Sequence, residues 1–157
     1  DIGDFKTFLK LSPPLRLEDD RTSLVNGIKS GLIDVIVSDH TPEDEEGKRL
    51  PFAQAATGAI GIETLLPLAL EMYHNDSLEL TKIIETLTIN PAKILKINKG
   101  TLTKGSNADI CVFDLDKPWV VNGDELKSKA KNTAIEGRKL QGKVLMTFLN
   151  GVLMFKS

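Results

Sequence analysis

The sequence contains few histidines, the residue type from which catalytic zinc sites are usually built. Only His40 and His74 are histidines among its 157 residues, whereas a catalytic zinc ion generally takes three protein ligands, most of them histidine. Two histidines do not complete such a set. The chain also begins at Asp1 instead of methionine, and we therefore expect it to be the C-terminal part of a longer protein.

Other absences narrow the class of protein. A single cysteine, Cys111, excludes an internal disulfide and fits a reducing, cytoplasmic compartment. Because Cys111 lies in an apolar run, we expect a buried small hydrophobe there. No apolar run approaches the roughly 20 residues that cross a bilayer. The net charge of −2, with acids and bases interspersed, indicates no surface for nucleic acid or membrane.

The most informative position is Asp39, where an apolar run ends in an acid. Residues 33–37 are mostly β-branched, the pattern of a strand buried on both faces, as in parallel sheets. In a barrel of alternating strands and helices, a carboxylate at the C-terminal end of a strand lies in the active site. Asp39 is therefore a candidate catalytic residue. The alternative is a plain polar turn after a strand, since Asp39 and Pro42 favour turns.

The segments before this strand alternate between strand and helix patterns. Residues 5–11 predict a short strand, closed by Pro13 and Pro14, which fit neither a ladder nor a helix interior. Residues 18–29 predict a helix, with acids in its first turn and Gly31 as its C-terminal stop. Strand, helix and strand with short links are typical of a parallel α/β unit.

A long polar loop over residues 41–61 follows, and loops of this length in compact domains are usually functional. Apolar spacing and capping residues then predict further helices. Three are expected: from Glu63 or Thr64 to Tyr73, over residues 80–87, and from Asn90, as N-cap, to about Lys96.

The pattern changes to β after Gly100. Residues 100–105 predict a turn-rich strand pair, and residues 108–115 predict a strand. Two further runs, residues 143–149 and 152–155, flank Asn150-Gly151, the preferred two-residue hairpin turn. Residues 1–98 therefore have the pattern of the end of an α/β barrel, and residues 99–157 that of a small all-β unit.

Six segments of the chain form a recognisable set: Lys10–Arg16, Ser38–Pro42, Lys48–Ala55, Gly58–Pro67, Asn90–Lys93 and Gly105–Asp114. Together they resemble the dihydroorotase branch of the amidohydrolase superfamily, and the resemblance covers essentially the whole chain. It implies an α/β fold: the C-terminal part of a (β/α)₈ TIM-like barrel in residues 1–98, and the C-terminal strands of a small β-sandwich in residues 99–157. The other metal ligands would lie upstream, so the chain alone is expected to be inactive.

The resemblance also implies a reaction and roles for named residues. The reaction is the reversible cyclisation of N-carbamoyl-L-aspartate to L-dihydroorotate in pyrimidine biosynthesis, with one or two zinc ions, in a cytoplasmic homodimer. Asp39 would ligate one metal and relay a proton to the departing amide nitrogen. Backbone groups of Thr57 and Gly58 would hold the substrate ring, although Gly58 could equally serve only the turn of its loop. His40 is expected to pack or to form a hydrogen bond, because its side chain lies opposite that of Asp39.

Two positions depart from the family pattern. Ser12 stands where an asparagine usually contacts the pyrimidine, and Glu43 stands where a histidine often helps to hold the substrate carboxylate. Glu43 would repel an anion. Two alternatives therefore stay open: a noncatalytic dihydroorotase-like subunit that supports aspartate transcarbamoylase, and a hydantoinase- or allantoinase-type cyclic amidohydrolase.

Overall fold

The computed structural model describes residues 5–157, which divide into two compact units built from separate stretches of chain. The first unit includes residues 38–65 and 120–139 together with the chain up to residue 21. The second unit combines residues 22–37, 66–119 and 140–157. The proposed boundary at residue 98 concerns the barrel and sandwich of the whole protein and stays a prediction.

Helix α1 (Glu18–Ser30) confirms the predicted helix over residues 18–29. Three acids occupy its first turn and Lys29 its last, where each charge opposes the helix dipole. Gly31 follows with φ +79°, a conformation that favours glycine at the end of a helix.

The predicted helices after residue 63 are present as α3 (Leu65–His74), α4 (Leu80–Leu87) and α5 (Ile89–Ile94). Pro67 is the third residue of α3, within the first turn, where its missing N–H costs nothing. Asn90 was wrongly expected as an N-cap: Thr88 precedes α5, and the Asn90 side-chain amide donates to the Asp34 carbonyl at 3.0 Å.

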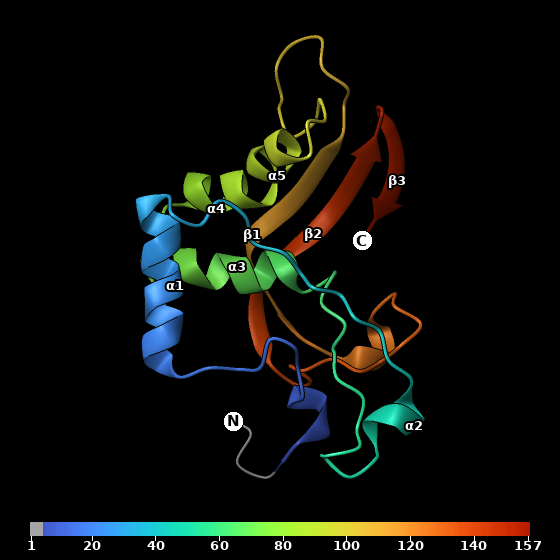
Figure 1. The fold of residues 1–157 in the computed structure, drawn as a ribbon. Coiled ribbons are helices and arrows are strands. Elements are labelled where there is room, and N and C mark those ends of the chain that lie inside the picture. The colour runs from blue at the N-terminus through green and yellow to red at the C-terminus, as the bar shows by residue number, and fades with distance from the viewer. Residues whose placement is uncertain (1–4) are drawn as a thin grey trace. The chain divides into compact units, whose positions relative to one another are not determined.

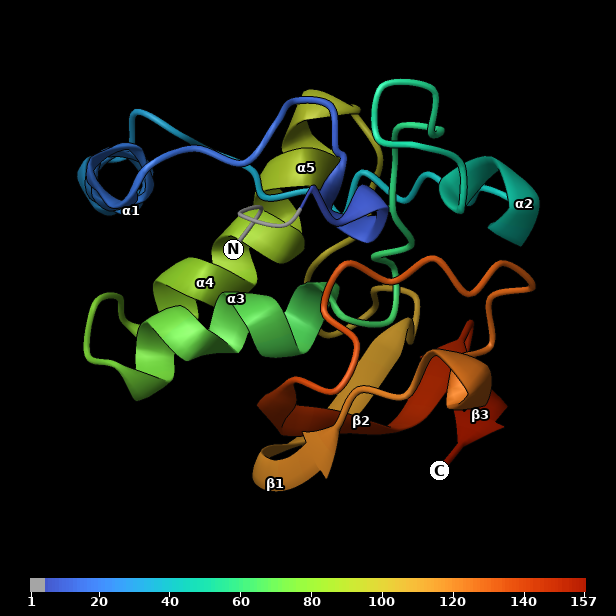
Figure 2. The ribbon, with the colours of Figure 1, turned by 90° about the horizontal axis from the view of Figure 1, so that it is seen from below.

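The core of the second unit forms where α1, α3 and α4 meet. Its fully buried members are Ile28, Ala69, Leu78 and Ile83, and Figures 1 and 2 show α3 between α1 and the sheet. The side chain of Leu70 lies so close to β2 that a Cβ on Gly142 would come within 2.5 Å of its Cδ1. Helix α3 therefore packs directly against the sheet.

The sheet contains β1 (Ile110–Val120), β2 (Lys139–Leu149) and β3 (Val152–Lys156), in that order. β2 and β3 pair antiparallel, with Leu149 opposite Val152. Asn150 and Gly151 form the predicted two-residue turn, both with positive φ (+51° and +80°), as a type I′ hairpin turn requires. Cys111 on β1 is exposed, so the expectation of a buried thiol was wrong.

Three predicted strands are absent from the described residues 5–157. Residues 7–9 form the short 3₁₀ helix η1 (Thr7–Leu9), and residues 100–105 lie in turns and irregular chain. Residues 33–37 form neither a helix nor a strand; the Ile36 N–H donates to the Thr86 carbonyl at 3.3 Å. A strand needs a neighbour to pair with, and none of the described residues supplies one here.

The first unit is mostly irregular chain around a polar interior. Helix α2 (Glu45–Lys48) interrupts the long loop, and η2 (Gly123–Glu125) follows β1. The buried residues of this unit include Lys48, Thr64, Asn132 and Thr133 beside Ala55, Ile60 and Leu126. Buried polar groups must find hydrogen-bond partners, so they organise the site described next. Within residues 5–157, no helix is both long and apolar enough to cross a membrane.

Candidate functional site

Segments with predicted site residues come together in the first unit. The Gly58 N–H donates to the Lys10 carbonyl at 3.0 Å, and the Thr41 N–H donates to the Ala59 carbonyl at 2.9 Å. These bonds join the chain before Ser12, the chain after Asp39 and the far end of the long loop. Residues distant in sequence therefore share one small region.

Asp39 is exposed at the surface of the first unit. Its backbone has φ +43°, a left-handed conformation that aspartate tolerates better than most residues. The Thr41 hydroxyl donates to the Asp39 carbonyl at 3.0 Å. Among the described residues, the Asp39 carboxylate has no hydrogen-bond or ion-pair partner, so it is free to bind a group from outside the chain.

His40 uses one ring nitrogen to hold the loop. Its Nδ1 accepts from the backbone N–H groups of Gly61 at 3.1 Å and Ile62 at 3.4 Å. A ring nitrogen that accepts carries no proton, which places the proton of the neutral ring on Nε2. These bonds agree with the expectation that His40 packs or forms hydrogen bonds.

Gly58 is buried, with φ +138°. A Cβ at this position would lie 2.6 Å from Thr41 Cγ2 and 2.8 Å from Thr41 Cβ, so glycine is required by close packing. Both backbone polar groups of Gly58 are engaged: the N–H by Lys10, and the carbonyl by Lys48 at 2.9 Å and Asn132 at 3.4 Å. The packing explanation for this glycine therefore has direct support.

Thr57 differs from Gly58 in this respect. It is half-buried, and none of its hydrogen-bonding groups has a partner among the described residues. Of the two residues predicted to hold the substrate ring, Thr57 is the one whose backbone remains available.

The two residues that depart from the family pattern differ in setting. Ser12 is exposed, whereas Glu43 is half-buried and its N–H donates to Asn132 Oδ1 at 3.2 Å. Burial lowers the pKa of the Lys48 ammonium, and the Glu43 charge raises that pKa in part. The Glu43 carboxylate therefore acts electrostatically on the neighbouring Lys48 ammonium.

Sequence reasoning missed the side chains that hold this region. Asn132 Nδ2 donates to the Thr41 carbonyl at 3.3 Å, while its Oδ1 accepts from Glu43. Lys10 Nζ donates to the carbonyls of Phe52 at 2.9 Å and Ala55 at 2.8 Å. No sequence signal marks these residues, because lysine and asparagine in polar segments usually face solvent.

A metal site would need more ligands than this region contains. Among residues 5–157, no three side chains of histidine, cysteine, aspartate or glutamate lie close enough together to hold a metal ion. The exposed, unpartnered Asp39 carboxylate is a hard oxygen donor that suits zinc as one ligand of several. The described residues therefore fit a metal only when further ligands come from outside them.

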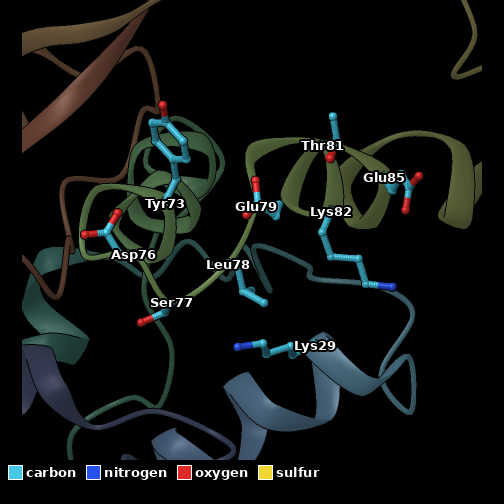
Figure 3. A pocket seen from close by; sticks show the side chains of 9 residues that line it. All are labelled: Lys29, Tyr73, Asp76, Ser77, Leu78, Glu79, Thr81, Lys82 and Glu85. Carbon is cyan, nitrogen blue, oxygen red and sulfur yellow. The ribbon is translucent and has the colours of Figure 1, made fainter.

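The second unit contains a cavity of about 470 Å³ beside α1 and α4 (Figure 3). Its lining includes Lys29 and Lys82 but also Asp76, Glu79 and Glu85. None of the predicted site residues lines it. The mixture of both charge signs favours no particular class of ligand.

The chain belongs to the amidohydrolase family, whose sequence pattern matches residues 10–154. Among curated proteins it is similar to the dihydroorotase of Ehrlichia chaffeensis, with 44% identity over 157 residues, which is 100% of this chain and 35% of that protein. The dihydroorotase of Aquifex aeolicus is 43% identical over 94% of this chain and 35% of its own length. The chain thus spans about a third of the length of the curated relatives that it matches.

Solved structures with a similar fold include hydantoinases. L-hydantoinase (dihydropyrimidinase) from Arthrobacter aurescens matches with a TM-score of 0.88 and 30% identity, over 99% of this chain and 36% of that one. A D-hydantoinase matches with a TM-score of 0.87 and 25% identity, over 96% of this chain and 34% of that one. The described chain is therefore an α/β fragment of that larger fold.

Proposed function

We propose that the whole protein to which this chain belongs is a zinc-dependent dihydroorotase that interconverts N-carbamoyl-L-aspartate and L-dihydroorotate in pyrimidine biosynthesis. The observation that carries the proposal is the exposed, unpartnered carboxylate of Asp39, on the segment that packs against Gly58. The curated relatives named dihydroorotase, which match over the whole chain, supply the reaction.

Hydrolysis of the ring adds hydroxide to the amide carbonyl carbon and a proton to the departing nitrogen, and the carbon–nitrogen bond breaks. When bound, zinc supplies Lewis-acid chemistry and makes hydroxide available near neutral pH. Asp39 would ligate the metal, take the proton of the attacking water and return it to the nitrogen as the ring opens. Cyclisation reverses these transfers.

The remaining site residues orient the substrate. Thr57, with unengaged backbone groups, is the better placed of the predicted pair to contact the ring, and Gly58 sets the path of the loop. Ser12, exposed at the surface, would reach the pyrimidine through a water molecule. Glu43 would disfavour the substrate carboxylate by like-charge repulsion.

The proposal extends to the architecture of the whole protein. Residues 1–98 would supply the C-terminal part of a (β/α)₈ barrel, and residues 99–157 the C-terminal strands of a β-sandwich. The upstream part would supply the other metal ligands. The whole protein would act in the cytoplasm as a homodimer.

A noncatalytic subunit that supports aspartate transcarbamoylase is the second candidate. It is favoured by Glu43 and Ser12, both of which depart from the pattern of a substrate site. A hydantoinase- or allantoinase-type enzyme is a third candidate, favoured by the similarity to L-hydantoinase at 30% identity.

Turnover by the full-length protein distinguishes these candidates. Dihydroorotate, hydantoin and allantoin are each offered to the zinc-loaded protein and to the same protein after chelation. We expect zinc-dependent hydrolysis of dihydroorotate and little of the other two. Preference for hydantoin or allantoin would contradict the substrate. No turnover by a folded, zinc-loaded protein would favour the noncatalytic subunit.

A further inference from the structure

Lys48 is a fully buried lysine, with 0% of its surface exposed. Its Nζ donates to the carbonyls of Gly58 at 2.9 Å, Ala56 at 3.0 Å and Lys10 at 3.4 Å. An ammonium group has three N–H donors, and three backbone acceptors match that number. All three N–H donors of the Lys48 ammonium are therefore bonded to backbone carbonyls of the candidate site.

The burial of the Lys48 ammonium carries a desolvation cost that other interactions must offset. Desolvation of a charge is costly unless the charge is paired and hydrogen-bonded, and burial lowers the pKa of the Lys48 ammonium. The Glu43 charge raises this pKa in part, and the Lys10 charge lowers it further. Among the described residues no carboxylate forms an ion pair with Lys48, so the backbone carbonyls are its main partners.

Two of these carbonyls belong to the neighbours of Thr57, one on each side. Ala56 and Gly58 are held by the same ammonium, while Thr57 between them has no hydrogen-bond partner among the described residues. The Gly58 carbonyl also accepts from Asn132 at 3.4 Å. The chain is therefore fixed on both sides of Thr57, and the backbone of Thr57 itself is left available.

We propose that Lys48 is a positioning residue that presents the backbone of Thr57 to the substrate. This inference rests on the dihydroorotase activity proposed above, and it adds a residue that acts through the loop without touching the substrate. Removal of the ammonium frees the Ala56 carbonyl, leaves the Gly58 carbonyl with Asn132 alone, and lets the Thr57 segment shift. Misplacement by about 1 Å can cost on the order of a hundredfold in catalysis, so a smaller shift weakens binding measurably.

Lys10 offers a matched control, because its side chain binds the same loop from outside it. Its Nζ also donates to three carbonyls, those of Phe52, Ala53 and Ala55, but none of them flanks Thr57. Lys10→Met and Lys48→Met thus remove the same chemical group and the same number of hydrogen bonds. Only the Lys48 change removes a hydrogen bond from each of the two neighbours of Thr57.

The test measures KM and kcat for dihydroorotate in the full-length zinc-loaded protein, with thermal unfolding as a check on folding. We expect Lys48→Met to raise KM about tenfold with a smaller change in kcat, and Lys10→Met to leave KM within about twofold of wild type. A wild-type KM in folded Lys48→Met, or an equal rise in both variants, would overturn the proposal. Equal rises would mean that any weakening of the loop has this effect.

A further variant covers the case in which Lys48→Met does not fold. Lys48→Gln keeps two N–H donors, but its nitrogen falls one bond short of the Nζ position, so KM is again expected to rise. A wild-type KM for this variant would overturn the role of Lys48. If the wild-type protein does not hydrolyse dihydroorotate, the result contradicts the proposed function, and the role of Lys48, which depends on that function, is contradicted too. An active wild type with unaffected variants overturns only the role of Lys48.

Discussion

Replacing Gly58 with alanine would force a methyl group into space that Thr41 occupies. The added Cβ would lie 2.6 Å from Thr41 Cγ2, 2.8 Å from Thr41 Cβ and 3.1 Å from the Thr41 carbonyl oxygen. Only the first of these atoms lies at the end of a side chain. The others are held by the backbone, which is fixed by the bond from the Thr41 N–H to Ala59 at 2.9 Å.

The expected cost combines two effects. A residue with a side chain at the φ of +138° of Gly58 carries backbone strain on the order of 1–3 kcal/mol. Overpacking of a tight site adds roughly 1–3 kcal/mol. We therefore expect Gly58→Ala to lower the free energy of unfolding by about 3 kcal/mol.

A variant of Gly137 separates the backbone strain from the overpacking. Gly137 also has positive φ, +73°, but a Cβ there would meet nothing within 4 Å. Gly137→Ala therefore carries only the strain of the backbone, about 1 kcal/mol. Equilibrium urea unfolding of the full-length protein compares the two variants. A Gly58→Ala variant that is no less stable than Gly137→Ala would refute the packing of Thr41 against Gly58.

A double mutant tests the contact itself. Thr41→Gly removes both side-chain atoms that the new Cβ would meet, so Gly58→Ala should cost less in that background. We expect a coupling free energy of about 1 kcal/mol, within the usual range for residues in contact. Additive effects would show that the strain of Gly58→Ala comes from another source.

Three further predictions concern Glu43, Asn132 and Asp109. Glu43→His should lower KM for dihydroorotate roughly fivefold by removing a charge that repels the substrate carboxylate, and an unchanged KM in steady-state assays would mean that the carboxylate binds elsewhere. Asn132→Ala should lower the free energy of urea unfolding by about 2 kcal/mol, because it leaves the half-buried Thr41 carbonyl and Glu43 N–H without their partner, and a loss near zero would contradict that bonding. The hydrogen bond from Lys99 lowers the pKa of the Asp109 carboxyl below its ordinary value, so the stabilisation is present above that ordinary value and is lost as pH falls through the lowered pKa. Asp109→Asn should therefore have a lower thermal midpoint than wild type at neutral pH, with a difference that shrinks in acid; a difference independent of pH would contradict the role of that bond.

The elements that sequence patterns predicted well depend on local interactions. Helix α4 follows from apolar residues at helical spacing over residues 80–87, and the hairpin turn follows from Asn150 and Gly151, which accept positive φ. In each case the signal lies within about ten residues of the element. The expected helix over residues 18–29 is present for the same reason: its acids, apolar face and terminal glycine all lie in one stretch.

The predictions that were wrong depended on partners far away in sequence. Residues 33–37 have the composition of a buried strand, yet no described strand pairs with them. Asn90 has the side chain of an N-cap, but the carbonyl of Asp34, 56 residues earlier, takes its amide instead. The buried Lys48 ammonium donates to the Lys10 and Gly58 carbonyls. Its burial could not be predicted from the residues that neighbour Lys48 in the sequence.

In the candidate site, too, features with a local sequence signal could be predicted, and features that depend on distant partners could not. Asp39 could be singled out because the end of an apolar run is visible in sequence. The distinction between Thr57 and Gly58 could not be made that way, since it depends on which backbone groups are already bonded to Lys10, Lys48 and Asn132. Those bonds span 10 to 74 residues along the chain.

The decisive measurement is turnover and zinc content of the Asp39→Asn variant of the full-length protein, with Asp44→Asn as the control. Asp44 is a nearby acid with a structural role, because its carboxylate caps α2 by accepting from the Gly47 N–H at 2.5 Å, and asparagine can cap equally well. We expect Asp39→Asn to abolish dihydroorotate hydrolysis and reduce bound zinc while unfolding as wild type does, and Asp44→Asn to keep both. Activity of Asp39→Asn within about tenfold of wild type, less than a catalytic acid or base usually contributes, would contradict the assignment of Asp39 as the metal-ligating acid.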